Sequence, residues 1–232
     1  MKVGILCAGD SELAPFLPIV GEEKITEKAL LKFYEGTIGG VDVVTLYSGV
    51  CKVNAAIATQ ILIDHFQVDA VINAGVAGGM NPRLEIFDTV IATEVVHHDM
   101  DTGILTDFHP WLETPFFDAD PELLRLSKLA VDKMQPVYRV LFGRMATGEA
   151  FIADEGREAI LEKFDPLTVD METAAVAQVC HANGVPFIAI RSITDTADHS
   201  GSEFFEMNCE KAAGIAKDIT LALLKELGAE KE

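Results

Sequence analysis

The amino-acid sequence predicts an α/β fold, a three-layer α/β/α sandwich with a central mixed sheet. Short apolar segments, typical of buried strands, alternate along the chain with longer segments of helical periodicity. Within this alternation, Leu31–Ile38 and Val41–Leu46 are joined by Gly39-Gly40, a dipeptide suited to a tight hairpin turn, so part of the sheet is antiparallel. The sequence has no internal repeat and no low-complexity linker, and we therefore expect one domain over residues 1–232.

The first elements follow from their apolar patterns. Lys2–Cys7 predicts the first strand, and Ala70–Ala74 and Asp88–Val96 predict two more after the hairpin. Before these two, Lys52–His65 has helical spacing and predicts a helix. Its apolar stripe, which belongs either to the core or to a dimer interface, consists of Val53, Ala56, Ile57 and Ile61.

The second half of the chain carries clear start and stop signals. Pro121–Lys133 opens with proline at a helix start, and Gly184 with Pro186 ends a helix before a strand. The other expected elements are strands at Val140–Ala146, Thr168–Asp170 and Phe187–Ser192 and helices at Asp154–Lys163, Glu172–Asn183 and Phe204–Leu227. Asp99–Phe117 is expected to be an irregular loop, and a loop of that length in a compact domain is more often functional than idle.

Composition narrows the class of partner and the compartment. With 37 acidic and 18 basic residues the net charge is -19, which repels phosphate backbones, so we expect neither nucleic acid nor an anionic membrane as a partner. Apolar runs such as Phe187–Ile190 are far too short to span a membrane. The N-terminus reads as a strand rather than a signal peptide, which predicts a cytoplasmic protein whose four scattered cysteines are free and mostly buried thiols.

Charged residues stand at the ends of apolar strands. Asp170 ends the strand at Thr168–Asp170 and Glu172 follows it, while Arg191 and Asp195 end the strand that starts at Phe187. Open α/β sheets bind their ligands at the carboxyl ends of parallel strands, so these residues mark a candidate active site.

Two roles are open for Glu12, which follows the first strand. It suits the first turn of a helix, and it also suits a position in the same crevice as Glu172 and Asp195. Carboxylates sharing a partly desolvated site push their pKa values apart and supply one acid and one base. Such a pair is suited to the hydrolysis of a glycosidic bond.

Other motifs exclude nucleotide-binding loops and metal sites or leave a residue's role open. The glycine-rich turn expected at Asn73–Gly79 is either a ligand-binding turn or a simple bend, and it matches neither a dinucleotide fingerprint nor a P-loop. The run His97–Asp101 lacks metal-ligand spacing, so no metal and no cofactor is expected. Phe151 is either a core residue or, if the ligand is a base, a stacking partner.

Taken together, these motifs resemble the bacterial 5′-methylthioadenosine/S-adenosylhomocysteine nucleosidases of the nucleoside phosphorylase superfamily. The resemblance covers nearly the whole chain, in the order and spacing of Met1–Leu13, Ser48–Val53, Asn73–Gly79, Gly148–Ile152, Val169–Glu172 and Arg191–Asp198. It implies a nucleoside phosphorylase/hydrolase-like fold, a homodimer, and hydrolysis of the N-glycosidic bond of 5′-substituted adenosines to adenine and a 5′-thioribose.

The resemblance also implies a role for individual residues. Asp195 would protonate adenine N7 as general acid, while Glu12 would act as general base on the attacking water, which Arg191 would help to hold. Glu172 and the backbone of Met171 would hold the ribose hydroxyls. The remaining positions assigned to the substrate site are Phe151, which would stack on adenine, Ile152, whose backbone would read the base edge, Val76 and Gly78.

The chain departs from the commonest pattern of the family at several positions. Asp170 replaces a glutamate, Val76 a frequent serine and Cys51 a frequent glycine. The stretch Asp101–Phe108 replaces a valine-threonine-alanine-phenylalanine-glycine segment that helps form the pocket for the 5′ substituent in the family. The 5′ preference is therefore the point at which this chain is expected to differ from its relatives.

Three alternatives to this nucleosidase remain. A phosphate-dependent phosphorylase needs basic groups around the phosphate, but no arginine precedes Arg83, and Lys52 at a helix start is expected to be solvated. A futalosine-type nucleosidase would differ in the 5′ pocket built by 99–117. A non-catalytic binding protein of the same fold would need none of the charged residues that end the strands.

Overall fold

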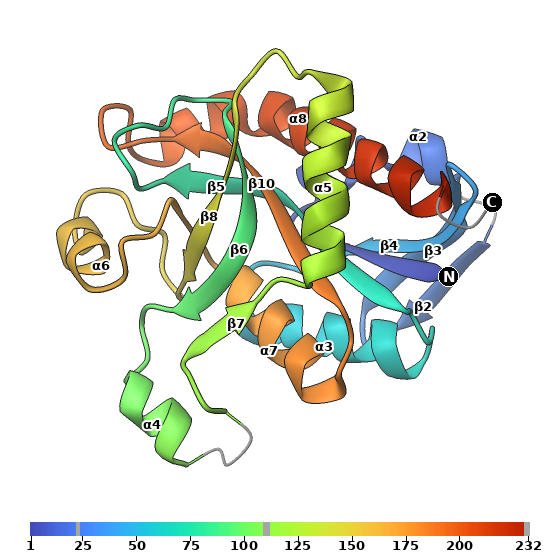
Figure 1. Cartoon of the computed structure of the whole chain (residues 1–232), viewed down its shortest axis with the longest axis horizontal. Helices are drawn as coiled ribbons and strands as arrows, with labels where there is room; N and C mark the ends of the chain where they lie inside the picture. The colour runs from blue at the N-terminus through green and yellow to red at the C-terminus, as the bar shows by residue number, and fades with distance from the viewer. Residues whose placement is uncertain (22–23, 109–111, 230–232) are drawn as a thin grey trace.

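A mixed sheet of ten strands runs through the centre of the described chain (Figure 1). The structure is a computed structural model and describes residues 1–21, 24–108 and 112–229. The first five strands are β1 (Lys2–Cys7), β2 (Lys24–Lys28), β3 (Leu31–Ile38), β4 (Val41–Tyr47) and β5 (Ala70–Gly79). The last five are β6 (Thr89–His97), β7 (Phe116–Asp118), β8 (Val140–Thr147), β9 (Thr168–Asp170) and β10 (Phe187–Asp195).

The pairing of the strands closes part of the sheet on itself. The order is β10-β6-β8-β9-β5-β1-β4-β3-β2, and β10 also pairs with β5 in parallel, so five strands form a ring from which β1, β4, β3 and β2 extend. β1 runs parallel to both β4 and β5, whereas β3 is antiparallel to β4, as the Gly39-Gly40 turn predicts. The carboxyl ends of β1, β5 and β10 therefore lie at one edge of the sheet.

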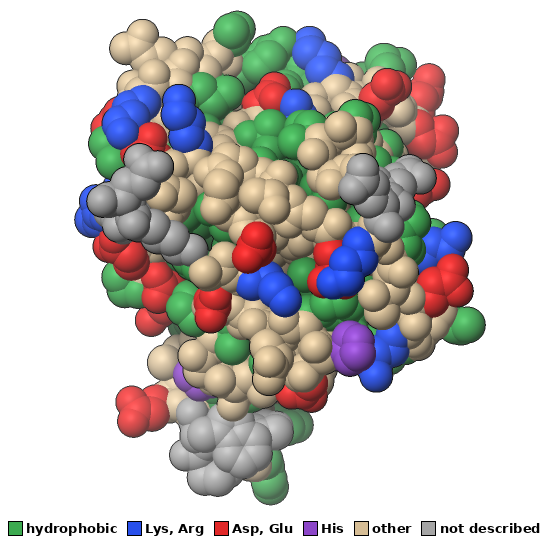
Figure 2. Space-filling view, turned by 90° about the vertical axis from the view of Figure 1, so that its right-hand side faces the viewer, with side chains coloured by type: hydrophobic (Ala, Val, Ile, Leu, Met, Phe, Trp, Pro, Cys, Tyr) green, Lys and Arg blue, Asp and Glu red, His purple; other side chains and the backbone are tan. Residues whose placement is uncertain are grey.

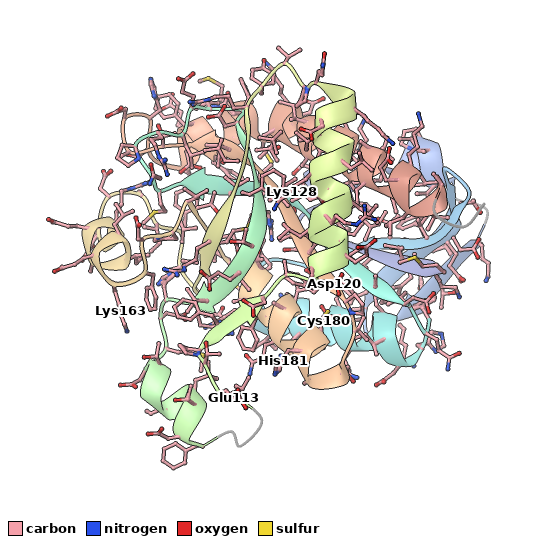
Figure 3. All side chains as sticks on the ribbon, viewed as in Figure 1. Glu113, Asp120, Lys128, Lys163, Cys180 and His181 are labelled. Carbon is pink, nitrogen blue, oxygen red and sulfur yellow. The ribbon has the colours of Figure 1, made fainter. Side chains whose placement is uncertain are left out.

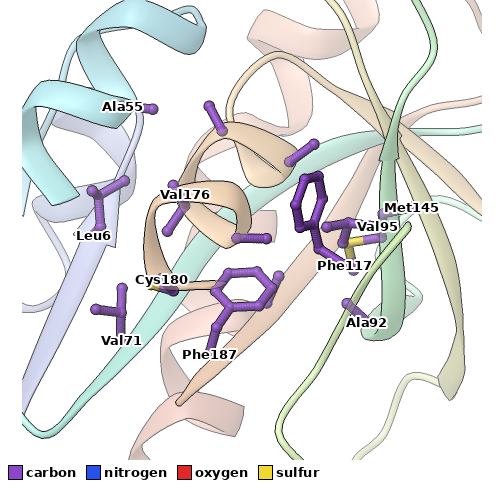
Figure 4. Packing of buried hydrophobic residues seen from close by; sticks show 14 of the residues in the cluster. Leu6, Ala55, Val71, Ala92, Val95, Phe117, Met145, Val176, Cys180 and Phe187 are labelled. Carbon is purple, nitrogen blue, oxygen red and sulfur yellow. The ribbon is translucent and has the colours of Figure 1, made fainter. Parts of the chain in front are cut away.

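Helices cover both faces of the sheet and make the three-layer sandwich (Figure 1). On one face α3 (Lys52–Asp64) and α7 (Thr173–Asn183) pack over a core that includes Val176, Cys180 and Phe187 (Figure 4). On the other face lie α1 (Asp10–Leu13), α2 (Leu17–Val20), α5 (Pro121–Met134) and α8 (Ser202–Ala229). Two short helices, α4 (Thr102–Asp107) and α6 (Arg157–Phe164), lie outside these layers, and α4 projects from the body (Figure 1).

The expected start of α5 is confirmed. Pro121 occupies the first turn, and the side chain of Asp120 accepts hydrogen bonds from the backbone N–H groups of Glu122 and Leu123 (Figure 3). This cap satisfies donors that have no partner within the helix. In the described chain no helix is both long and apolar enough to cross a membrane.

The prediction of a glycine-rich turn after the strand at Ala70–Ala74 is wrong. β5 continues as a strand to Gly79, because its glycines pair with β10 on one side and with β9 on the other. The loop expected over Asp99–Phe117 is also partly ordered, as α4 and the start of β7, although residues 109–111 of it lie outside the described residues. Pairing with other strands holds the end of β5 and β7, whereas α4 is capped locally by the side chain of Asp101.

The apolar stripe expected on α3 is divided between the core and the surface, since Ile61 packs against the core. Val53 and Ile57 are exposed, and the residues of α3 that pack inward are Ala55, Ala58, Thr59 and Leu62. The exposure of Val53 and Ile57 therefore rules out a core role for these two side chains and leaves the interface role open. The cysteines are free as expected, and Cys7, Cys180 and Cys209 are buried.

Candidate active site

A cavity of about 270 Å³ lies where β1, β5, β9 and β10 end. The side chains and backbone that line it include Glu12, Val76, Gly78, Phe151, Met171, Glu172, Arg191 and Asp195. Ile152 lines a smaller recess of about 30 Å³ that shares Gly78, Phe151 and Asp195 with this cavity. The structure thus brings together all nine residues that the sequence assigned to the site, although their individual roles remain predictions.

Glu12 takes both of the positions that the sequence left open. It is the third residue of helix α1. Its Oε2 accepts from the backbone N–H groups of Ala8 at 2.6 Å and Gly9 at 2.9 Å. Its other oxygen, Oε1, points into the site and accepts from the N–H of Val76 at 2.7 Å. Three backbone donors match an ionised carboxylate, which only accepts hydrogen bonds.

Arg191 is a buried cation that contacts the two buried carboxyl groups of Glu12 and Glu172. It is 1% exposed, and Nη1 donates to the carbonyl of Val76 at 3.0 Å and lies 3.4 Å from Oε1 of Glu12. Nη2 donates to Oδ1 of Asn73 at 2.8 Å and lies 3.3 Å from Oε2 of Glu172. A buried guanidinium needs such partners on every side, so its orientation is fixed.

Two residues that the sequence did not assign hold this arginine. Asn73 is fully buried, and its Nδ2 donates to the carbonyl of Leu6, which turns Oδ1 toward Arg191. The hydroxyl of Thr173 donates to the same Oδ1 and accepts from Arg191 Nε at 3.2 Å. Asn73 was visible only as the first residue of the glycine-rich motif, and no local signal marked Thr173.

Asp170 shapes the turn that presents Glu172. Its Oδ1 accepts from the backbone N–H groups of Glu172 and Thr173 and from the hydroxyl of Thr147 at 2.8 Å. Oε1 of Glu172 accepts from the N–H of Cys51 at 2.9 Å. Burial raises the pKa of Glu172 to about 7, and the nearby carboxylates of Asp170 and Glu12 act in the same direction.

Cys51 has a backbone conformation that favours glycine, the residue common at this position in the family pattern. Its φ is 85°, in the left-handed region that favours glycine. The residue is therefore strained, yet its N–H still reaches Glu172. Asp170 makes its three hydrogen bonds through Oδ1, while its Oδ2 is buried without a partner among the described residues.

Asp195 ends β10 and lines both the cavity and the smaller recess beside it. Its side chain lies against Gly78, where a Cβ would fall 3.1 Å from Oδ2, so the absence of a side chain there allows the carboxyl group to enter the site. Oδ1 accepts from the hydroxyl of Thr194 at 2.7 Å, while Oδ2 is buried and has no partner among the described residues. Burial raises the pKa of Asp195, as a general acid requires.

Phe151 forms the open wall of the cavity. Its side chain is 46% exposed, and its ring meets Phe205 of α8 edge to face, with ring centroids 6.1 Å apart. A core role for Phe151 does not fit this exposure. Phe205 and Cys209 also line the cavity and come from a helix in which the sequence marked no site residue.

Lys52 is not solvated as expected. Its Nζ lies 2.7 Å from Oδ1 of Asp99, whose Oδ2 also accepts from the N–H of Glu149. This ion pair neutralises the lysine outside the cavity lining, which leaves Arg191 as the cationic side chain lining the cavity in the described chain. Within the described ranges, no group of three or more His, Cys, Asp or Glu side chains has an arrangement that could hold a metal ion.

Known proteins resemble this chain over nearly its full length. The sequence pattern of the phosphorylase superfamily matches residues 2–225. A 5′-methylthioadenosine/S-adenosylhomocysteine nucleosidase of Exiguobacterium sp. is 40% identical over 98% of this chain and 99% of its own. The nucleosidase of the same name from Colwellia psychrerythraea, solved with adenine, has a TM-score of 0.89 at 35% identity, over 98% of this chain and 96% of that chain. A futalosine hydrolase of Helicobacter pylori has a TM-score of 0.87 at 28% identity, over 97% and 98%.

Proposed function

Because the chain belongs to the phosphorylase superfamily and, within it, to the 5′-methylthioadenosine/S-adenosylhomocysteine nucleosidases, we propose that it hydrolyses the N-glycosidic bond of these two nucleosides. The products are adenine and the 5′-thioribose. The observation that carries the proposal is the contrast between two buried carboxyl groups in one cavity. Asp195 has an oxygen without a donor, whereas Glu12 accepts from three backbone N–H groups.

This contrast supports Asp195 as the acid and Glu12 as the base. Burial raises the pKa of Asp195, which favours the protonated carboxyl group that gives its proton to adenine N7 as the glycosidic bond breaks. Glu12 takes a proton from the attacking water beside Arg191, which lies 3.4 Å from its Oε1. Breaking the bond leaves positive charge on the sugar, and the carboxylates of Glu12 and Glu172 stabilise that charge.

The substrate is held on both sides of the scissile bond. Glu172 and the backbone of Met171 face the cavity from the turn before α7 and suit the ribose hydroxyls. Phe151, at the wall of the cavity, suits the flat face of adenine, and Ile152 lies in the recess beside Asp195. Val76 offers no hydroxyl to the water, so Glu12 and Arg191 hold it without a serine.

Water, rather than phosphate, is the nucleophile that the charges of the cavity favour. A phosphate dianion requires converging cationic donors. The guanidinium of Arg191 already contacts Glu12, Glu172 and Asn73, and Lys52 is paired with Asp99. The described cavity therefore presents an excess of carboxylates to an incoming anion.

The experiment is adenine release from methylthioadenosine, S-adenosylhomocysteine and 5′-deoxyadenosine, each without and with phosphate. Release that does not depend on phosphate is expected, and the three rates rank the 5′ preference. Release only with phosphate would make the protein a phosphorylase. No release from any of the three would favour futalosine-type substrates, which the likeness to the futalosine hydrolase and the altered 101–108 segment keep as the second candidate.

We also propose a homodimer that forms across α3 and α7. Val53 and Ile57 expose 68% and 45% of their surface, and Val53 lines a hollow of about 450 Å³ between these helices. Ile104 and Phe108 expose further apolar surface at α4. Light scattering on the purified protein is expected to give twice the chain mass, and Val53→Asp is expected to give a monomer. A monomeric wild type would refute the dimer.

Two further expectations complete the proposal. Residues 1–232 form a single nucleosidase domain, which is supported by a superfamily match over residues 2–225 and by one continuous sheet.

The protein acts in the cytoplasm on small nucleosides and binds neither nucleic acid nor membrane, which is supported by its free thiols and its net charge of -19. On the face in Figure 2, Asp and Glu side chains are dispersed among Lys and Arg rather than gathered at one place. Cell fractionation tests the compartment.

A further inference from the structure

Arg157, the first residue of α6, is a buried cation outside the cavity lining. It is 7% exposed, although arginine is rarely buried without a specific set of partners. Nε donates to the carbonyl of Ala153 at 2.9 Å, and Nη1 donates to the carbonyl of Gly79 at 2.6 Å. One guanidinium therefore joins the loop after β8 to the end of β5.

Both carbonyls lie next to residues of the active site. Ala153 directly follows Phe151 and Ile152, which line the recess for the base. Gly79 directly follows Gly78, which pairs with Asp195 across a bulge in the β5–β10 ladder. Arg157 thus connects two segments, and their relative position sets the distance between the proposed adenine site and the carboxyl group of Asp195.

Arg157 also acts on Asp195 through space. Its positive charge lowers the pKa of Asp195, in opposition to the larger effect of burial. Nη2 of Arg157 and Oδ2 of Asp195 are both buried, and neither has a hydrogen-bond partner among the described residues. The other ionisable groups that line the cavity with Asp195 are Glu12, Asp170, Glu172, Arg191 and Cys209.

We propose that Arg157 is a positioning residue for the glycosidic-bond reaction, which fastens the base-binding loop to β5 beside Asp195 and tunes the acid through its charge. The inference rests on the proposed function, since it takes Asp195 as the acid and Phe151–Ile152 as the base site. A misplacement of about 1 Å between reacting groups costs on the order of 100-fold in rate. Loss of the two hydrogen bonds from Arg157 is therefore expected to lower the rate, although Arg157 does not line the cavity.

The test compares Arg157→Met with Arg157→Lys in steady-state adenine release from methylthioadenosine over a range of pH. Arg157→Met is expected to raise KM and lower kcat, each by about 10- to 100-fold. Without the cation the pKa of Asp195 is higher, and because the protonated acid is the active form, the alkaline fall of kcat moves to higher pH. Arg157→Lys keeps the charge, so its alkaline limb stays at the wild-type pH while its rate still falls.

Arg144→Met is the matched control. Arg144 is a half-buried arginine that pairs with Glu94 and donates to the carbonyl of Phe164, away from the cavity lining. Its loss is expected to leave both KM and the alkaline limb unchanged. If Arg157→Met does not fold, Arg157→Gln replaces it as the uncharged variant.

The outcomes separate the two proposals. A folded, uncharged Arg157 variant with wild-type KM and an unmoved alkaline limb would overturn the positioning role. A lower rate with an unmoved limb and an unchanged KM would show a merely structural residue and would overturn it as well. Absence of adenine release from the wild type would instead refute the proposed function, independently of Arg157.

Discussion

Arg191 Nη1 lies 3.4 Å from Glu12 Oε1, although 179 positions separate the two residues in the chain. The contact is longer than a tight ion pair, because the same Nη1 donates to the carbonyl of Val76 at 3.0 Å. The guanidinium is therefore held by its other partners, the carbonyl of Val76, Asn73 and Thr173, and does not depend on Glu12 for its position. The proposed base, Glu12, is likewise fixed by three backbone N–H groups rather than by Arg191.

Asp195→Asn is expected to lower kcat for adenine release by about 100- to 10,000-fold, the usual contribution of a general acid. The amide is nearly isosteric and can still accept from Thr194, so the protein is expected to fold. Stopped assays of adenine release and a thermal melt measure the two effects. A folded variant with a near-normal rate would refute the role of Asp195. Asp165→Asn, at the exposed end of α6, is the matched control and should keep the wild-type rate.

Glu12→Gln is expected to abolish hydrolysis while the protein still binds substrate. The amide cannot accept a proton from water, and its NH₂ group must face a backbone N–H of Ala8, Gly9 or Val76. This mismatch is expected to cost about 1–3 kcal/mol in unfolding free energy. Calorimetric titration with methylthioadenosine measures the binding.

Loss of binding in Glu12→Gln would change the role of Glu12 from base to ligand holder. Asp10→Asn is the appropriate control, because Asp10 is the exposed acidic neighbour on the same helix. Its removal is expected to leave both rate and affinity unchanged.

The strands that could be predicted from sequence are those with their own apolar signal. β10 is buried at every position, and its segment was recognised up to Ser192. β2 was missed because it pairs with β3 but exposes most of its side chains, so that no alternation of polar and apolar residues marks it. The end of β5 was missed for the opposite reason: its glycines signal a turn, while their pairing partners are distant in sequence.

The residues of the candidate site likewise fall into those that could be predicted from the sequence and those that could not. Glu12, Arg191 and Asp195 stand at strand ends, where the topology of a parallel sheet brings residues together whatever their separation along the chain. Asn73 could not be assigned, since its role depends on a side-chain hydrogen bond to Arg191 across 118 positions. The pairing of Lys52 with Asp99 was unpredictable for the same reason, and local rules favoured a solvated lysine.

Glu172→Gln is expected to reduce the pH dependence of stability. Burial raises the pKa of Glu172 from 4.5 to about 7 in the folded protein, so the folded state holds a proton that the unfolded state has lost. Stability from this group is present below pH 4.5, decreases as the pH rises to about 7 and stays reduced above it, by at most about 3 kcal/mol. Urea unfolding at pH 4.5 and pH 8 should therefore show a smaller loss of unfolding free energy in the variant.

An equal loss in wild type and Glu172→Gln would contradict this account of the buried carboxyl group. Glu162→Gln serves as the control, because Glu162 lies exposed on α6. It is expected to reproduce the wild-type dependence on pH.

Gly75→Ala is expected to lower kcat by about 100-fold or more through geometry alone, since it alters no charge. A Cβ at this position falls 2.6 Å from Cδ of Glu12 and 2.9 Å from Nη1 of Arg191, closer than real Cβ contacts. The carboxylate or the guanidinium must therefore move, and both are fixed by buried hydrogen bonds. Gly214→Ala, within α8, meets nothing within 4 Å and should keep full activity while gaining about 0.5–1 kcal/mol in unfolding free energy. Adenine release and urea unfolding of the two variants measure these effects, and wild-type activity in Gly75→Ala would show that the contact between Glu12 and Arg191 is dispensable for catalysis.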